Sequence, residues 1–126
     1  FDVILKENAK IRFTGFVSFD ELRKFYSEAS MLLFPSLYEG FGLPVLEAMA
    51  FNLPIAASSR ASIPEVGGDY IVYFDPESKI EIAEAILGIL NDKMQCKISK
   101  YEDNLKKYTW NICATKTIEY IKKLAE

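Results

Sequence analysis

Met31-Leu-Leu-Phe-Pro-Ser-Leu-Tyr-Glu39-Gly-Phe-Gly-Leu-Pro44-Val-Leu-Glu47-Ala-Met-Ala50 joins an apolar run to a glycine-rich loop and a helix start. The first four residues are continuously apolar, which is typical of a strand buried on both faces of a sheet. Pro44 suits the first turn of a helix, because the N–H that proline lacks would have no partner there. We expect this helix to continue through Glu47 to about Phe51, with Asn52 at its C-terminal cap.

The rest of the chain repeats this alternation of strands and helices. Apolar runs predict three further strands, at Ile11 to Phe16, Pro54 to Ser58 and Ile71 to Phe74. Helical spacing and N-cap residues, among them Ser18 and Thr109, predict helices at Phe19 to Glu28, from Asp75 to Leu90, at Tyr101 to Lys107 and at Trp110 to Leu124. Apolar strands that alternate with helices require cover on both faces. The predicted fold class is therefore α/β, a Rossmann-like parallel sheet with flanking helices.

Length and composition describe an ordinary globular domain without an internal boundary. The chain has 126 residues, half of them hydrophobic, and a formal net charge of −3, which argues against a protein whose main task is to grip nucleic acid. Its longest apolar runs fall far below the ~18 residues needed to cross a bilayer. Cys96 and Cys113 share no metal-ligand spacing and lie in segments expected to be helical, so neither a disulfide nor a zinc site is expected.

The loop between the apolar run and the helix has residues suited to a phosphorylated sugar ligand. Gly40 and Gly42 let the backbone approach a bulky group, and the helix start at Leu43 favours phosphate. Glu47 is placed to accept both hydroxyls of a ribose, and Glu39 to reach sugar hydroxyls beyond the diphosphate. Ordinary turn chemistry explains the glycines alone, and a solvated first-turn carboxylate explains Glu47 alone. The joint pattern, two glutamates with seven residues between them, favours a nucleotide-sugar site.

Glu39-Gly-Phe-Gly-Leu-Pro-Val-Leu-Glu47-Ala-Met-Ala resembles the E-x7-E motif of glycosyltransferase family 4, which has the two-domain GT-B fold. The resemblance covers roughly Asn8 to Leu90. Segments similar to the family in the same order are Ile11 to Val17, Ala29 to Ser36, Pro54 to Ser58, Ile63 to Val66 and Val72 to Pro76. Phe51-Asn52-Leu53 departs from the Cys-Gly-Thr turn common in the family, but Asn tolerates the left-handed conformation.

The resemblance implies a role for each part of the site. It assigns Glu39 to the donor sugar near the reacting centre, as the catalytic residue, and Glu47 to the donor ribose. The other donor-binding positions it implies are Gly40, Phe41, Gly42 and Leu43 at the sugar and diphosphate, with Phe16 and Val17 near the base. The family transfers sugar with retention of anomeric configuration and without a required metal. No cofactor is therefore expected beyond the substrate, a nucleotide sugar such as a UDP- or GDP-sugar.

The resemblance also implies what surrounds this chain. Residues 1–126 are expected to be a partial C-terminal domain, truncated on its N-terminal side and inactive alone, with a glycan or lipid-linked acceptor bound by an N-terminal domain outside the chain. The expected location is the cytoplasm, with attachment to the inner face of a membrane only through that other domain. In GT-B enzymes the final helix often crosses toward the other domain. An exposed apolar strip from Trp110 to Leu124 is thus expected, the alternative being that Trp110 packs in this core.

Other functions remain open on the sequence alone. One is a GT-B-like module that binds or senses nucleotide sugars without transfer, and another is a GT-B enzyme such as a nucleotide-sugar epimerase. A receiver-like or flavodoxin-like signalling domain is a third, although the acidic cluster of such receivers is missing. The presence of both Glu39 and Glu47 favours a transferase, which would act in the synthesis of polysaccharide or a similar glycan.

Overall fold

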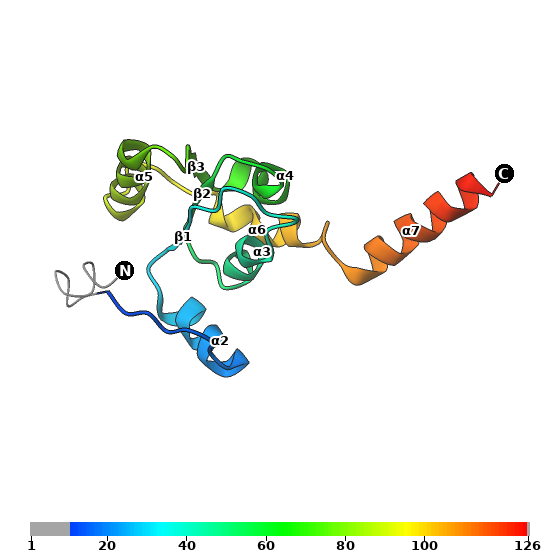
Figure 1. The fold of residues 1–126 in the computed structure, drawn as a ribbon, viewed down its shortest axis with the longest axis horizontal. Coiled ribbons are helices and arrows are strands. Elements are labelled where there is room, and N and C mark those ends of the chain that lie inside the picture. Colours follow the sequence, from blue (N-terminus) through cyan, green and yellow to red (C-terminus); the bar gives the residue numbers. More distant parts are fainter. Residues whose placement is uncertain (1–10, 126) are drawn as a thin grey trace.

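The computed structural model of the chain describes residues 11–125. Within that range a parallel three-stranded sheet has the order β1 (Leu32–Phe34), β2 (Ile55–Ser58) and β3 (Val72–Phe74), and Figure 1 shows its place at the centre of the body. Every residue of β2 is buried, because β2 has a neighbour on each side and helices above and below. The three predicted strands from Met31 to Phe74 are confirmed.

Helices cover both faces of the sheet, as the apolar strands require. The helices are α2 (Phe19–Glu28), α3 (Leu43–Ala50), α4 (Ile63–Gly67), α5 (Lys79–Leu90), α6 (Tyr101–Leu105) and α7 (Trp110–Leu124), with 3₁₀ turns η1 (Gly68–Tyr70) and η2 (Ile98–Lys100). Ile55 and Ala57 of β2 belong to the core cluster formed with α3, α4 and α6, whereas Ala56 belongs to the cluster formed with α5. Successive side chains of β2 thus belong to the cores on opposite faces of the sheet. The predicted α/β class is confirmed.

Local sequence signals account for where the helices begin. Ser18 accepts a hydrogen bond from the backbone N–H of Glu21, whose carboxylate accepts from the backbone N–H of Ser18 at 2.9 Å, so α2 starts with the predicted capping box. Thr109 caps α7 by accepting from the N–H of Ile112 at 3.3 Å. Both predicted N-caps are confirmed.

Three predictions about local structure are wrong. Residues 11–16 form no strand and pair with no strand among the described residues, although Gly15 has the positive φ of a turn (62°). The helix expected from Asp75 begins at Lys79, because Ser78 is its N-cap. Cys96 lies in a loop, where its thiol contacts the backbone N–H and carbonyl of Ile55 at 3.3 and 3.4 Å.

The last helix projects away from the body, as Figure 1 shows for α7. None of its residues from Trp110 to Leu124 is buried, and Trp110 is 89% exposed. The expected exposed apolar strip is confirmed, and the alternative that Trp110 packs in the core is wrong. Large apolar side chains exposed along this helix are Trp110, Ile118, Tyr120, Ile121 and Leu124.

Candidate functional site

The predicted donor loop leaves the carboxyl end of β1 and enters α3 at Gly42. In parallel sheets this edge is where ligands bind. Gly42 is the N-cap of α3 with φ 104°, and no side chain of the described residues caps this helix start. The N–H of Val45 donates to the Gly42 carbonyl at 3.0 Å, and Pro44 has no N–H. Leu43 is therefore the first-turn residue whose N–H is left for an anion, together with the positive end of the helix.

Contacts from other elements hold the loop in place. The hydroxyl of Ser62, which directly precedes α4, donates to the carbonyl of Glu39 at 2.9 Å. The ring of Phe41 meets the edge of Tyr108 at 5.7 Å between centroids, and the Tyr108 hydroxyl donates to the carbonyl of Glu65 at 2.8 Å. Glu39 is half-buried. These backbone and ring contacts restrict the loop before any ligand is present, and sequence reasoning identified neither Ser62 nor Tyr108.

Glu47 lies one helical turn after the loop and faces α2. The hydroxyl of Tyr26 donates to Glu47 Oε2 at 2.8 Å, and the Tyr26 ring stacks on Phe51 at 5.6 Å with an interplanar angle of 21°. Burial, reinforced by the hydrogen bond to Glu47, raises the pKa of Tyr26 well above its ordinary value. The Tyr26 hydroxyl is thus a donor at any physiological pH. No motif in the sequence singles out Tyr26, because its partner lies 21 residues away.

The predicted site residues fall into two groups. Glu39, Gly40, Phe41, Gly42, Leu43 and Glu47 form one continuous loop and helix start. Phe16 and Val17 lie apart from them, on the segment that enters α2, and Phe16 is fully exposed, so its side chain is not packed against the loop. Tyr26 of α2 connects that segment to α3 by its contacts with Glu47 and Phe51.

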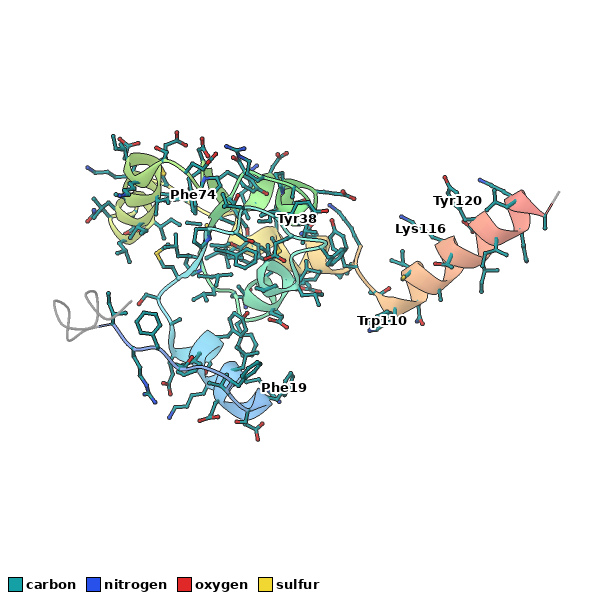
Figure 2. All side chains as sticks on the ribbon, in the orientation of Figure 1. Phe19, Tyr38, Phe74, Trp110, Lys116 and Tyr120 are labelled. Carbon is teal, nitrogen blue, oxygen red and sulfur yellow. The ribbon has the colours of Figure 1, made fainter. Side chains whose placement is uncertain are left out.

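A groove of about 520 Å³ opens beside the loop, between the start of α3 and the start of α7. Phe41 and Leu43, both predicted donor-binding residues, belong to its wall. The other lining residues, of which Figure 2 labels Trp110 and Lys116, are Leu46, Lys107, Tyr108, Thr109, Trp110, Ile112, Cys113 and Lys116. The loop therefore borders open space instead of being packed beneath other elements.

Arg60 connects two loops at the same edge of the sheet. Its guanidinium Nη2 lies 3.0 Å from Asp75 Oδ1 and 2.9 Å from Glu77 Oε2, so it joins the end of β2 to the end of β3. The backbone N–H of Glu77, together with Arg60, lowers the pKa of Asp75. Arg60 thus has a structural role here. Glu65 also belongs to a structural element, because it lies within α4.

Two kinds of feature are absent from residues 11–125. No helix in that range has the length and apolar character needed to cross a membrane. The same residues contain no group of three or more His, Cys, Asp and Glu side chains arranged to hold a metal ion.

Comparison with known proteins points to one family. A family model described as "Glycosyl transferases group 1" matches residues 4–110. O-antigen chain mannosyltransferase B of Escherichia coli is 38% identical over 116 residues, which are 90% of this chain and 30% of that protein. O-antigen chain mannosyltransferase RfbU of Salmonella typhimurium is 34% identical over 110 residues, covering 87% of this chain and 30% of that protein. The chain thus spans about a third of the length of these curated relatives.

A solved structure supports the same fold. Sucrose-phosphate synthase from Thermosynechococcus elongatus superposes with a TM-score of 0.79 over 98% of this chain and 33% of its own, at 23% sequence identity. At that identity the likeness concerns the fold alone. The sequence match reaches residue 110, well beyond the Leu90 to which the sequence resemblance extended.

Proposed function

Because this chain belongs to the glycosyl transferases group 1 family, we propose that it holds the nucleoside diphosphate sugar from which a glycosyltransferase takes its sugar. The observation that carries this proposal is the start of α3. Gly42 brings the chain into the helix with no side-chain cap, and a glutamate lies on either side of that point. An uncapped helix start with a conformationally permissive glycine is a favourable binding site for a diphosphate.

Each glutamate takes a separate part of the donor. Glu47 accepts hydrogen bonds from the ribose hydroxyls, because a carboxylate has several acceptor sites in one plane. Glu39 contacts the transferred sugar at the reacting centre, and backbone groups from Gly40 to Leu43 line the sugar and diphosphate. Phe16 and Val17 lie on the side of the base. The transfer proceeds with retention of configuration and without a required metal, as in the E-x7-E family that the loop resembles.

The start of α3 contributes to the reaction and not only to binding. As the sugar departs, negative charge grows on the diphosphate that remains. The positive end of the helix stabilises that charge more strongly than it stabilises the intact donor, and such differential stabilisation lowers the barrier. The loop contacts of Ser62 and Phe41 support this effect, because a preorganised site has less to rearrange during the reaction.

The names of the relatives guide the choice of sugar and acceptor. Two of them are O-antigen chain mannosyltransferases, which supports a mannose donor and a growing glycan as the acceptor. The acceptor site is proposed to lie in sequence outside this chain, since the relatives are about three times as long. We propose that the whole enzyme acts in polysaccharide synthesis, in line with the O-antigen names of these relatives, and that it works in the cytoplasm.

Titration of the chain with nucleotide sugars tests the donor site directly. GDP-mannose, UDP-glucose and plain UDP are added separately while backbone amide shifts are followed by NMR. We expect one of the sugar nucleotides to perturb residues from Glu39 to Glu47 at submillimolar to millimolar concentration. Shifts that leave this loop unchanged at millimolar ligand would rule out the donor site. Binding without turnover in the full-length protein would instead favour a non-catalytic module.

Two substitutions in the full-length enzyme separate the roles of the glutamates. Glu47→Ala should raise the donor KM by about tenfold or more, the loss expected for hydrogen bonds to a charged group, with a smaller change in kcat. Glu39→Gln should lower kcat by a larger factor than it raises KM. Glu65→Gln is the matched control, since Glu65 is exposed on α4. Wild-type kinetics in both site variants would contradict these roles.

A further inference from the structure

The hydrogen bond between Tyr26 and Glu47 joins two helices that are distant in sequence. Tyr26 lies on α2 and Glu47 on α3, and the hydroxyl lies 2.8 Å from Glu47 Oε2 in a partly buried position. A tyrosine hydroxyl withdrawn from water needs a partner, so the contact could serve Tyr26 alone. The surroundings of both residues indicate that it also serves Glu47.

The Tyr26 ring is restrained from a second direction. It stacks on Phe51, the C-cap residue of α3, and packs against the main core cluster. The hydroxyl is therefore presented to Glu47 from a ring whose position is set by aromatic and core contacts. A donor held in this way orients its acceptor, because rotation of the carboxylate would break a charge-assisted hydrogen bond.

The geometry leaves acceptor sites on Glu47 for a ligand. An ionised carboxylate has about four lone-pair sites on its two oxygens, and Tyr26 takes one site on Oε2. Two sites on Oε1 and one on Oε2 therefore remain, enough to accept two more hydrogen bonds. Neighbouring hydroxyls on one ring, such as the 2′ and 3′ hydroxyls of a ribose, require two acceptors in a fixed plane.

We propose that Tyr26 is a positioning residue that orients the Glu47 carboxylate toward the ribose hydroxyls of the donor. This inference rests on the proposed function, in which Glu47 binds the ribose. The raised pKa of Tyr26 agrees with it, since a hydroxyl that stays protonated always donates. Tyr26 also connects α3 to the helix that follows Phe16 and Val17, so one side chain aligns the ribose contact with the base side of the site.

Discrimination between ribose and deoxyribose is the property that tests this role. Dissociation constants are measured for GDP, UDP and their 2′-deoxy forms with the unmodified 126-residue chain and with Tyr26→Phe, which removes the hydroxyl and keeps the ring. We expect the unmodified chain to prefer the ribonucleotide by about tenfold, as for a lost hydrogen bond to a charged group. In Tyr26→Phe the preference should fall to about threefold or less, through weaker ribonucleotide binding alone.

Two further variants identify the cause of any change. Tyr120→Phe removes the same hydroxyl from an exposed tyrosine on α7 and should leave the preference unchanged. Glu47→Ala should abolish the preference. If Tyr26 had a merely structural role, Tyr26→Phe would weaken the binding of ribo- and deoxyribonucleotides by the same factor. An unchanged ratio of the two dissociation constants in Tyr26→Phe would therefore overturn the inference.

The failure of this inference and that of the proposed function give different results. If no nucleotide binds the unmodified chain, the donor site fails and the role of Tyr26 fails with it. If Glu47→Ala abolishes the preference while Tyr26→Phe keeps it, the donor site stands and only the role of Tyr26 is wrong. If Tyr26→Phe does not fold, Phe51→Leu provides the second test, because it removes the stacking partner and keeps the hydroxyl. A preference retained in full by Phe51→Leu would then overturn the inference.

Discussion

Gly42 is the residue on which the shape of the donor loop depends most directly. Its φ of 104° lies in the region that side chains with a Cβ rarely adopt, and it begins α3. A Cβ there would meet only Ile63 Cγ1, at 3.9 Å, so space is not the constraint. The constraint is the backbone conformation, which places the helix start at the carboxyl edge of the sheet.

Gly42→Ala should therefore lower the free energy of unfolding by about 1–2 kcal/mol, the usual cost of a left-handed backbone in a residue with a Cβ. Gly40→Ala is the matched control two residues earlier, where φ is not in that region and no described atom lies within 4 Å of an added Cβ. Gly40→Ala should change the unfolding free energy by less than about 0.5 kcal/mol. Urea denaturation measures both, and equal losses would contradict the conformational argument.

At the scale of elements, the end of α3 explains how the chain tolerates a departure from the family pattern. Asn52 has φ 55°, its N–H donates to the Met49 carbonyl at 2.9 Å, and the N–H of Leu53 donates to the Ala48 carbonyl at 3.0 Å. This pair of bonds is a Schellman motif, with Asn where glycine is usual. Phe51 is the C-cap, and Asn52, as the left-handed residue after it, closes the helix as predicted and turns the chain from α3 into β2.

Replacement of Asn52 tests this cap. Asn52→Ala should lower the free energy of unfolding by about 1 kcal/mol, because alanine tolerates the left-handed region less well than Asn, whereas Asn52→Gly should cause no loss. Asn91→Ala serves as the control, since Asn91 is the C-cap of α5 and has a φ of −104°. Thermal and urea unfolding provide the values. An Asn52→Gly variant as unstable as Asn52→Ala would show that the side chain, not the backbone, is what the position requires.

At the scale of the whole molecule, α7 is a helix that the rest of the described chain leaves uncovered. It projects from the body, and none of its residues from Trp110 to Leu124 is buried. The main core is complete without it, because Tyr101 and Asn104 of α6 already close the face that α3 and α4 build. The helix thus adds an exposed apolar surface and little to the core.

Truncation after Thr109 should leave the free energy of unfolding within about 1 kcal/mol of the value for the whole chain, since exposed residues contribute little to stability. It should also reduce the binding of a hydrophobic dye, because the exposed apolar side chains of α7 are removed. Truncation after Lys100 is the control and should abolish cooperative unfolding by removing buried Tyr101 and Asn104. If truncation after Thr109 lowered the free energy of unfolding by several kcal/mol, α7 would be shown to stabilise the domain.

Short-range signals were sufficient for much of this protein. Apolar runs located the three strands of the sheet, and caps at Ser18, Asn52 and Thr109 located helix ends, because each depends on residues within a few positions of one another. The loop between Glu39 and Glu47 is also a short segment, and its residue types predict a donor site, which stays a prediction. The apolar pattern from Ile11 to Phe16 predicted a strand that the structure does not have, because such a pattern becomes a strand only where a neighbouring strand pairs with it.

Contacts between distant segments decided the rest. Tyr26 reaches Glu47 across 21 positions and Ser62 reaches Glu39 across 23, so no local pattern could identify either partner. The exposure of Trp110 likewise depends on which surfaces the other elements leave uncovered. Backbone propensity and capping act over one or two helical turns, whereas the position of a carboxylate depends on which helices the packed sheet brings together.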